Sequence, residues 1–458
     1  MCPIWPLHII ILYLLALCPV WVICQAAPNL LANFEPDSLT IHMDAYNFID
    51  VNVTGGLQPA DEFSFNIPND HVAGATWNSS YKVTEDDVTN GRWNGRLQVY
   101  GKFLGRTDLS LEVQRGSASP KLPVNGSVAV TVLRPERVID TIFTTSVALF
   151  VSLIFINFGC AMHWPTVKDV LKRPIGPLIG MCGQFIFMPL MTFGLGYLVF
   201  PSMPEMHLGM FCTGVAPGGG ASNIWTFILG GNLDLSLAMT SISTIAAFGF
   251  MPLWLFSLGQ VVFRNANIVV PYARIAMFVV GLIVPLSIGL GIQKWLPRIS
   301  AFMVRILKGF STTLLLFIII FAIVTNLYIF ELFTWEIIVA GMGVPWLGYA
   351  AGYLLARICR QPHADALAIS IETGIQNTGI AIFLLRYALP QPEADLTTVV
   401  PVSVAIMTPF PMMAIFIYQK IKACFKNRGQ QKKRLEESNN SVVPGYSEPA
   451  IVATIDVK

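Results

Sequence analysis

Charged residues are scarce in this chain. Asp, Glu, Lys and Arg make up 12% of its 458 residues, about half of their share in a typical soluble protein, whereas hydrophobic residues make up 54%. This composition excludes an ordinary soluble domain and predicts a membrane protein. The net charge of +2 also gives no reason to expect a nucleic-acid partner.

Cysteine is absent from residues 25–159, and elsewhere the cysteines show no metal-ligand spacing. A domain formed by residues 25–159 therefore has no internal disulfide bond. We interpret the later cysteines as small residues of a hydrophobic core, so the sequence predicts no resident metal and no other cofactor.

The N-terminus carries an apolar run at 9–24 that ends in small residues. The run is shorter than the roughly 20 residues that a transmembrane helix needs, and it lacks a strongly basic start. We predict a cleaved signal peptide at 1–25, with an uncleaved membrane anchor as the alternative.

Residues 26–137 predict a small β-sandwich outside the cytosol. Apolar and polar residues alternate with period two in short segments separated by Gly, Asn, Asp and Pro, as in half-buried strands. The clearest segments are 39–43, 63–67, 97–100, 109–113 and 128–132. N-glycosylation sequons begin at Asn52, Asn78 and Asn125. Three sequons behind a signal sequence indicate a glycosylated extracellular or luminal domain.

Residues 138–423 contain nine apolar stretches, each long enough to cross about 30 Å of hydrocarbon. They lie at 140–162, 176–200, 206–229, 234–262, 272–293, 309–331, 334–356, 364–389 and 396–420. An odd number of spans with the N-terminus outside places the C-terminus in the cytosol. The positive-inside rule supports this orientation, because the predicted inner loops and the tail hold most of the flanking Lys and Arg residues. The polar tail at 424–458 is predicted to be disordered, and its basic residues predict attraction to anionic membrane lipids.

Two of the apolar stretches contain residues that interrupt a helix. Pro217 and Gly218 begin a Pro-Gly-Gly-Gly run in the third stretch, and Glu372 and Gly374 lie near the middle of the eighth. A proline inside a helix costs about 3 kcal/mol or more, and a Glu at the membrane centre costs roughly 3 kcal/mol on insertion scales. Taken singly, the first could be a kink that serves helix packing, and the second could be a satisfied polar cluster between helices.

The positions of the two interruptions point to a transporter. If the first half of the chain has lost or replaced one helix, the interruptions fall in the fourth helix of each five-helix half. Paired interrupted helices at corresponding positions of two inverted halves indicate a midplane binding site. We therefore predict an all-α polytopic membrane protein with an inverted-repeat transporter fold and two broken helices that cross.

Oxygen-bearing side chains around the first interruption suit a sodium ion. Ser222 and Asn223 directly follow the glycines, and Ser236 and Thr240 share one face of the next predicted helix. Sodium prefers hydroxyl, amide, carbonyl and carboxylate oxygens. Ser236 and Thr240 could instead bond to the backbone of their own helix, which is the commoner behaviour of such pairs.

The second interruption offers both side-chain and backbone oxygens. Glu372 and Gln376 have an i, i+4 spacing across it. Unwound backbone also frees carbonyl groups, such as those of Thr373 and Ile375, for a cation. The two interruptions together therefore predict an oxygen-lined cation site in the membrane.

These motifs resemble those of the bile acid:sodium symporter family, and the resemblance covers about 138–423. It rests on Pro217-Gly218-Gly219 with Ser222-Asn223, Gly231-Asn232 with Leu235-Ser236 through Thr240, Gln184 before Met188-Pro189, and Glu372-x-Gly374-x-Gln376-Asn377. The signal peptide and the added β-rich domain are similar to those of the family's orphan branch.

The resemblance implies a core domain that moves against a panel domain, with two sodium sites in the core. The first site is implied at Ser222, Asn223, Ser236, Thr240 and Glu372. The second is implied at Gln184, Glu372, Gln376 and the carbonyls of Thr373 and Ile375. The substrate side is implied at Asn377, Gly219 and Gly220. Gly220 and Val215-Ala216 depart from the residues common in the family, so the solute stays open.

The sequence thus predicts sodium-coupled symport of an organic anion, such as a bile acid or steroid conjugate, by alternating access. Sodium is then a transported ion rather than a cofactor. We expect the plasma membrane, with an internal membrane as the alternative. The rival hypothesis is a transport-inactive receptor or scaffold whose β-domain binds a ligand. An enzyme is not predicted, because His163 and His207 lie at helix ends and no nucleophile–base pair emerges.

Overall fold

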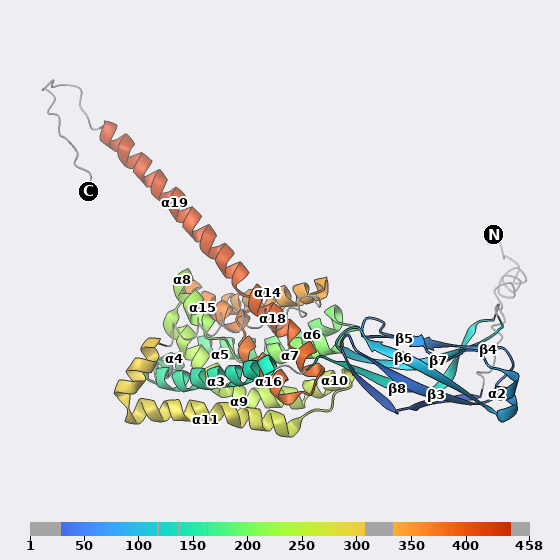
Figure 1. The fold of residues 1–458 in the computed structure, drawn as a ribbon. Coiled ribbons are helices and arrows are strands. Elements are labelled where there is room, and N and C mark those ends of the chain that lie inside the picture. The colour runs from blue at the N-terminus through green and yellow to red at the C-terminus, as the bar shows by residue number, and fades with distance from the viewer. Residues whose placement is uncertain (1–28, 117–118, 136–137, 163, 307–332, 441–458) are drawn as a thin grey trace, which may run out of the picture. The chain divides into compact units, whose positions relative to one another are not determined.

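The computed structural model describes residues 29–116, 119–135, 138–162, 164–306 and 333–440. The chain divides into two compact units, Met1–Glu136 and Arg137–Lys458 (Figure 1). The predicted signal peptide at 1–25 and the apolar stretch at 309–331 lie outside the described residues.

The first unit is β-rich, as its alternating pattern predicted. Its elements are β1 (Leu30–Glu35), β2 (Ser38–His42), β3 (Tyr46–Gly55), β4 (Asp61–Asn66), β5 (Ala73–Trp77), α2 (Glu85–Asn90), β6 (Arg92–Gly101), β7 (Gly105–Arg115) and β8 (Lys121–Leu133). The five segments with the clearest alternation all fall on strands, and β1, β3 and β5 are additional.

The strands form two ladders that share a core. One ladder has the order β1-β3-β6-β5 and the other β4-β7-β8-β2, and β8 also pairs with β1 at one position. Inward side chains of both ladders form one hydrophobic cluster, in which Phe63 and Trp93 are buried with their ring centroids 4.5 Å apart. Strand residues alternate between this core and the solvent, which is why the period-two pattern was readable.

The second unit is helical. Before the described residues break at 306, its elements are α3 (Val138–Ala161), α4 (Trp164–Leu171), α5 (Ile175–Cys182), the π-turn η1 (Gly183–Phe187), α6 (Met188–Val199), α7 (Pro204–Gly214), α8 (Ala221–Leu229), α9 (Leu233–Phe256), α10 (Leu258–Asn265) and α11 (Tyr272–Trp295). After residue 332 they are α14 (Trp335–Ile358), α15 (His363–Gly374), α16 (Thr378–Ala388), α17 (Glu393–Leu396), α18 (Val399–Met407) and α19 (Pro409–Asn440).

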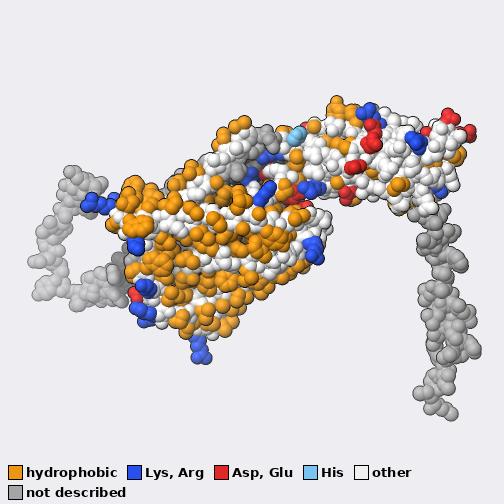
Figure 2. Space-filling model, turned by 90° about the horizontal axis from the view of Figure 1, so that it is seen from below, with side chains coloured by type: hydrophobic (Ala, Val, Ile, Leu, Met, Phe, Trp, Pro, Cys, Tyr) orange, Lys and Arg blue, Asp and Glu red, His pale blue; other side chains and the backbone are white. Residues whose placement is uncertain are grey.

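Within the described residues, five helical segments are long and apolar enough to cross a membrane. They are Ile175–Val199, Leu233–Phe256, Tyr272–Trp295, Trp335–Ile358 and Glu393–Phe425, and the bent pair Ala148–Ala161 and Trp164–Leu171 makes a sixth when it is counted as one span. The predicted spans 206–229 and 364–389 do not qualify as single helices because each is interrupted. Figure 2 shows hydrophobic side chains over most of one face of the helical unit, as expected for a surface that meets lipid.

Glycines let helices of this unit approach closely. On α3 and α11, Gly159 and Gly289 face each other, and a Cβ on either would overlap backbone atoms of the other helix. On α14, a Cβ on Gly348 would lie 2.8 Å from the Cα of Gly374 in α15. Ser370 of α15 also donates a hydrogen bond to the carbonyl oxygen of Tyr349 at 2.7 Å. Helix α14 therefore supports α15 where α15 ends.

The C-terminal segment differs from the prediction. Helix α19 continues to Asn440, so the backbone at 424–440 is helical where the sequence predicted disorder. The reason is local, since this segment is rich in Lys, Arg, Gln and Glu, which favour helix, and it extends a helix that is already nucleated. Residues 441–458 lie outside the described part of the chain.

Candidate ion site at the crossing of two interrupted helices

The first interruption separates α7 from α8 at 215–220. Helix α7 ends at Gly214 with Val215 as its C-cap, and Ala216 and Pro217 continue in non-helical backbone before α8 begins at Ala221. Pro217 has no N–H to continue a helix, and the glycines after it have no side chains to fill the space beside the chain. The break therefore leaves backbone groups inside the unit that need partners.

The second interruption supplies those partners. Helix α15 ends at Gly374, and α16 begins at Thr378. The N–H of Gly219 donates to the carbonyl oxygen of Ile375 at 2.7 Å, and the N–H of Asn377 donates to the carbonyl oxygen of Pro217 at 2.9 Å. The two broken segments thus meet as a short antiparallel bridge centred on Gly218 and Gln376. Non-helical backbone is tolerated at membrane depth where protein buries it in this way.

Glu372 lies buried beside this bridge, with 2% of its surface exposed. Its Oε2 atom accepts hydrogen bonds from the hydroxyls of Ser222 at 2.6 Å and Thr240 at 2.9 Å. Its Oε1 atom is buried and has no hydrogen-bond partner among the described residues. A Cβ on Gly218 would overlap that oxygen. A buried acceptor without a partner is costly, so this position suits a cation or a proton.

A second group of oxygens adjoins Glu372 on α8 and α9. The hydroxyl of Ser236 donates to Oδ1 of Asn223 at 2.9 Å, and the Thr240 hydroxyl lies 3.4 Å from the same oxygen. Thr240 also lies 3.0 Å from the carbonyl oxygen of Ser236, so the bond to its own helix that the sequence left open is available here as well. These three residues and Ser222 connect α8 to α9 and both to the Glu372 carboxylate.

Gln184 connects a third helix to the crossing. It lies on the π-turn η1, and a π-turn inside a long helix often marks a functional site. Its Nε2 atom donates to the carbonyl oxygen of Ala216 and to Oε1 of Gln376, each at 2.7 Å. The Nε2 atom of Gln376 in turn donates to the carbonyl oxygen of Thr373 at 2.7 Å. Gln184 therefore bridges the two interruptions through buried amides.

The remaining predicted residues lie at the edges of the crossing. The carbonyl of Ile375 already accepts the Gly219 N–H, which leaves one lone pair for a cation. Asn377 caps α16, since its Oδ1 accepts from the N–H of Ile380 at 3.2 Å, and it is half-buried. Gly220 is also partly exposed, and a Cβ there would lie 3.2 Å from the Phe158 ring. Asn377 and Gly220 thus border the buried cluster rather than form it.

Sequence reasoning missed Ser243. Its hydroxyl would lie 3.4 Å from a Cβ on Gly218, near the unpartnered oxygen of Glu372, and it donates to the carbonyl oxygen of Thr240 at 3.1 Å. The signal was present, because Ser243 follows Thr240 by three residues and so shares its helix face. The oxygen atoms at this site belong to hydroxyl, amide, carbonyl and carboxylate groups. Such oxygens are the ligands that a hard cation prefers.

The chain is similar to proteins named as sodium-dependent transporters. The model of the sodium bile acid symporter family matches residues 148–331. The chain is 33% identical over 270 residues to the ileal sodium/bile acid cotransporter of Oryctolagus cuniculus, covering 58% of this chain and 75% of that one. It is 32% identical over 250 residues to the sodium-dependent organic anion transporter of Bos taurus, covering 54% and 65%.

The chain is also similar to a protein whose name states no solute. It is 32% identical over 280 residues to the P3 protein of Homo sapiens, covering 60% of this chain and 58% of that protein. The match thus spans little more than half the length of the P3 proteins. Among solved structures, domains 4 and 5 of the S-layer protein SbsC match 23% of the chain at 14% identity, with a TM-score of 0.17. That score is too low to support any argument.

Proposed function

The chain belongs to the sodium bile acid symporter family, and from that premise we propose that it transports an organic anion together with sodium by alternating access. The family is one of transporters, not enzymes, and the apolar helices make the chain an integral membrane protein. The observation that carries the proposal is the buried Glu372 carboxylate, with one oxygen unpartnered, at the crossing of two interrupted helices.

Two sodium positions are proposed at this crossing. The first uses the carboxylate of Glu372 with Ser222, Asn223, Ser236 and Thr240. The second uses Glu372 as well, together with Gln184, Gln376 and the carbonyls of Thr373 and Ile375. Support comes from the hydrogen bonds that already bring the oxygens of each set together, and from the Oε1 atom of Glu372, which has no partner among the described residues.

Coupling to substrate follows from the position of the crossing. Each sodium ion would hold the ends of broken helices from both halves of the chain, so its binding favours one arrangement of those helices. Asn377, Gly219 and Gly220 lie next to the cluster and are the proposed substrate-facing residues. Nine spans in an inverted repeat, with the β-rich unit outside and the C-terminus in the cytosol, are the proposed topology, in the plasma membrane.

The energetics permit active uptake. A tenfold sodium gradient supplies about 1.4 kcal/mol per ion, and a membrane potential of about 60 mV supplies about as much again. Two ions thus supply about 5.5 kcal/mol, and moving a monovalent anion inward takes back about 1.4 kcal/mol. The remainder corresponds to roughly thousandfold accumulation. We propose an amphipathic organic anion, such as a steroid conjugate or bile acid, because two relatives are named for such solutes.

A transport-inactive receptor or scaffold is the second candidate, favoured by the separate β-rich unit with its own core. The first experiment separates the two without a known solute. It measures the melting temperature of the purified protein in sodium and in potassium, for wild type, Glu372→Ala, Gln376→Ala and the control Thr226→Val. Thr226 is buried on α8, and its hydroxyl has no hydrogen-bond partner among the described residues.

The expected result is stabilisation by sodium alone, of about 1.4 kcal/mol at ten times the dissociation constant. Both variants at the crossing lose this stabilisation and Thr226→Val keeps it. Sodium-driven uptake of labelled bile acids and steroid sulfates into proteoliposomes then identifies the solute. If sodium and potassium give the same melting temperature for wild type, sodium coupling is wrong and the receptor becomes the better hypothesis.

A further inference from the structure

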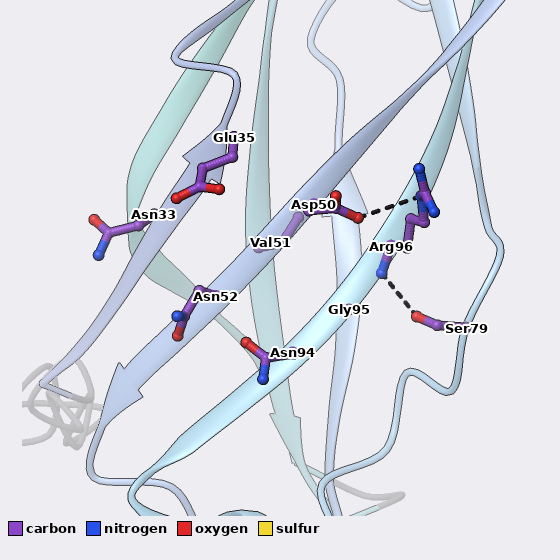
Figure 3. A pocket seen from close by; sticks show the side chains of 9 residues that line it. All are labelled: Asn33, Glu35, Asp50, Val51, Asn52, Ser79, Asn94, Gly95 and Arg96. Carbon is purple, nitrogen blue, oxygen red and sulfur yellow. Dashed lines mark hydrogen bonds and ion pairs between the residues drawn. The ribbon is translucent and has the colours of Figure 1, made fainter.

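The outward face of the β1-β3-β6 ladder has a polar groove. Asn33, Asn52 and Asn94 pair in register across the three strands. In the next row on the same face, Asp50 stands opposite Glu35 on one side and Arg96 on the other. These side chains line a depression of about 390 Å³ (Figure 3), within the range of roughly 300–1,000 Å³ of small-molecule sites.

A sequon lies in the centre of this groove. Asn52 is the acceptor residue of Asn52-Val53-Thr54, and Thr54 is on the same face of β3 because side chains alternate along a strand. Oδ1 of Asn52 is buried without a hydrogen bond. The other atom of that amide is Nδ2, the nitrogen to which an N-linked glycan is attached, and it is therefore the atom left toward the groove.

The walls of the groove have the chemistry of a carbohydrate site. Asn33 and Asn94 flank Asn52 with amides that can both donate and accept, and Glu35 and Asp50 supply acceptors for hydroxyl groups. The side chains of Asn33 and Asn94 are short enough to leave the space beside Asn52 open. A sugar attached to Asn52 would thus meet hydrogen-bonding groups on both sides.

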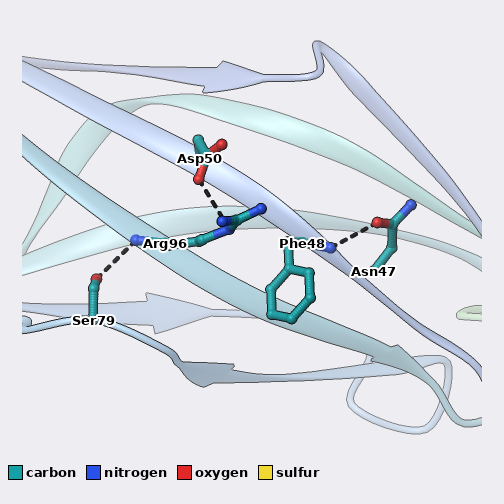
Figure 4. A network of polar contacts seen from close by, with 5 residues as sticks. All are labelled: Asn47, Phe48, Asp50, Ser79 and Arg96. Carbon is teal, nitrogen blue, oxygen red and sulfur yellow. Dashed lines mark hydrogen bonds and ion pairs between the residues drawn. The ribbon is translucent and has the colours of Figure 1, made fainter.

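One wall of the groove carries an ion pair. The guanidinium of Arg96 lies 3.3 Å from the carboxylate of Asp50 and 4.7 Å from the centre of the Phe48 ring (Figure 4). The backbone N–H of Arg96 donates to the hydroxyl of Ser79 at 2.8 Å. Arg96 and Asp50 therefore border the groove with a pair of opposite charges that a polar ligand can contact, and both side chains are more than half exposed.

We propose that the groove holds the first sugar of an N-linked glycan on Asn52, so that this glycan lies along the β1-β3-β6 face. The proposal rests on the outside location of the β-rich unit given under the proposed function. Asn125, on β8, is exposed and lies outside the groove. A glycan on Asn125 would therefore project freely, and the two sites should differ in accessibility.

The test uses the full-length protein, produced in mammalian cells and purified in detergent. Site occupancy is measured by mass spectrometry, and glycan release by peptide-N-glycosidase is followed separately at Asn52 and Asn125. In the native protein we expect release at Asn52 to be at least about tenfold slower than at Asn125, because the sugar must first leave the groove. After denaturation, the two rates become equal. The double variant Asn33→Ala/Asn94→Ala should increase the rate of glycan release at Asn52 in the native protein and leave the rate at Asn125 unchanged.

Three results would overturn the proposal. Occupancy at Asn125 but not at Asn52 shows that the groove holds no glycan. Equal native rates at the two sites show that a glycan on Asn52 is not held, and this comparison needs no variant. Absence of glycan from all three sequons overturns the proposal together with the outside location. Sodium-dependent stability of the helical unit is independent of each result, so failure here is distinguishable from failure of the transport proposal.

Discussion

Between α7 and α8 the chain is interrupted by a proline and three glycines, whereas between α15 and α16 it is interrupted beside Glu372, Gln376 and Asn377. The first interruption contributes backbone N–H and carbonyl groups and no polar side chain. The second contributes a carboxylate and two amides. The two segments are in direct contact, because the N–H of Gly219 donates a hydrogen bond to the carbonyl oxygen of Ile375 at 2.7 Å. The difference between them therefore decides what each contributes to the same site.

The glycines at 218–220, here called the bare segment, allow the polar segment beside Gln376 to approach. A Cβ on Gly218 would overlap Oε1 of Glu372, and a Cβ on Gly219 would lie 2.9 Å from the carbonyl oxygen of Gln376. If both interruptions carried side chains, the bridge could not close and Glu372 would not face α8 and α9. The comparison teaches that the glycines are part of the site even though they offer no ligand of their own.

The largest expected effect comes from filling the bare segment. Gly218→Ala places a methyl group against Glu372 Oε1, so we expect a loss of about 3 kcal/mol in the free energy of unfolding and loss of the sodium response. The measurement is the melting temperature in sodium and potassium. Gly194→Ala on α6 is the control, since nothing lies within 4 Å of its Cβ position, and a helix interior gains about 0.5–1 kcal/mol from that change. A Gly218→Ala protein that still responds to sodium would contradict this account.

A smaller effect is expected from the hydroxyls that hold the carboxylate. Ser222→Ala removes a 2.6 Å hydrogen bond to Glu372, which should lower the free energy of unfolding by about 2 kcal/mol, as for bonds to charged groups. In a Glu372→Gln background the same change should matter less, and chemical denaturation measures both. Ser241→Ala on α9 is the control, because that exposed hydroxyl bonds only to its own helix backbone among the described residues. Equal losses in the two backgrounds would show that Ser222 acts independently of Glu372.

Next comes the amide pair that joins the interruptions. Gln184→Leu removes donors to the Ala216 carbonyl and to Gln376, and we expect about 1.5 kcal/mol of destabilisation because a buried acceptor is left unpaired. In a double-mutant cycle with Gln376→Leu, the coupling energy should exceed about 0.5 kcal/mol. Additive effects of the two changes would mean that the π-turn serves helix packing and not the crossing.

Both interruptions could be predicted from the sequence, because helix-breaking and charged residues stand out within apolar stretches. Pro217 and its glycines are incompatible with a regular helix, and Glu372 is incompatible with an apolar stretch, so both were visible without a structure. The period-two pattern was similarly clear in β6, β7 and β8, where one face is buried and the other solvated. In each of these cases the local sequence pattern was sufficient to predict the feature.

The remainder depends on contacts between distant parts of the chain. That the Ile375 carbonyl accepts the Gly219 N–H follows from the arrangement of two helices, and no local pattern encodes it. The residues of the π-turn, Gly183–Phe187, resemble ordinary apolar helix, so the turn that carries Gln184 was not predictable. The helical backbone at 424–440 was missed for another reason, since high polarity was given more weight than the helix propensity of Lys, Glu and Gln.

The smallest expected effect tests the half-helices that begin after each interruption. Helix α16 begins at Thr378 and is capped by the side chain of Asn377, whereas α8 begins at Ala221, and its N-cap residue Gly220 provides no side-chain cap. Asn377→Ala should lower the free energy of unfolding by about 1 kcal/mol through loss of the cap, and Gly220→Ala should change it by less, about 0.5 kcal/mol. Both should keep the sodium response, because neither residue is in the buried cluster. If Asn377→Ala abolished the sodium response, Asn377 would belong to the ion site. The site would then reach beyond Gln376 to the start of α16, and the cap would not be the main role of this side chain.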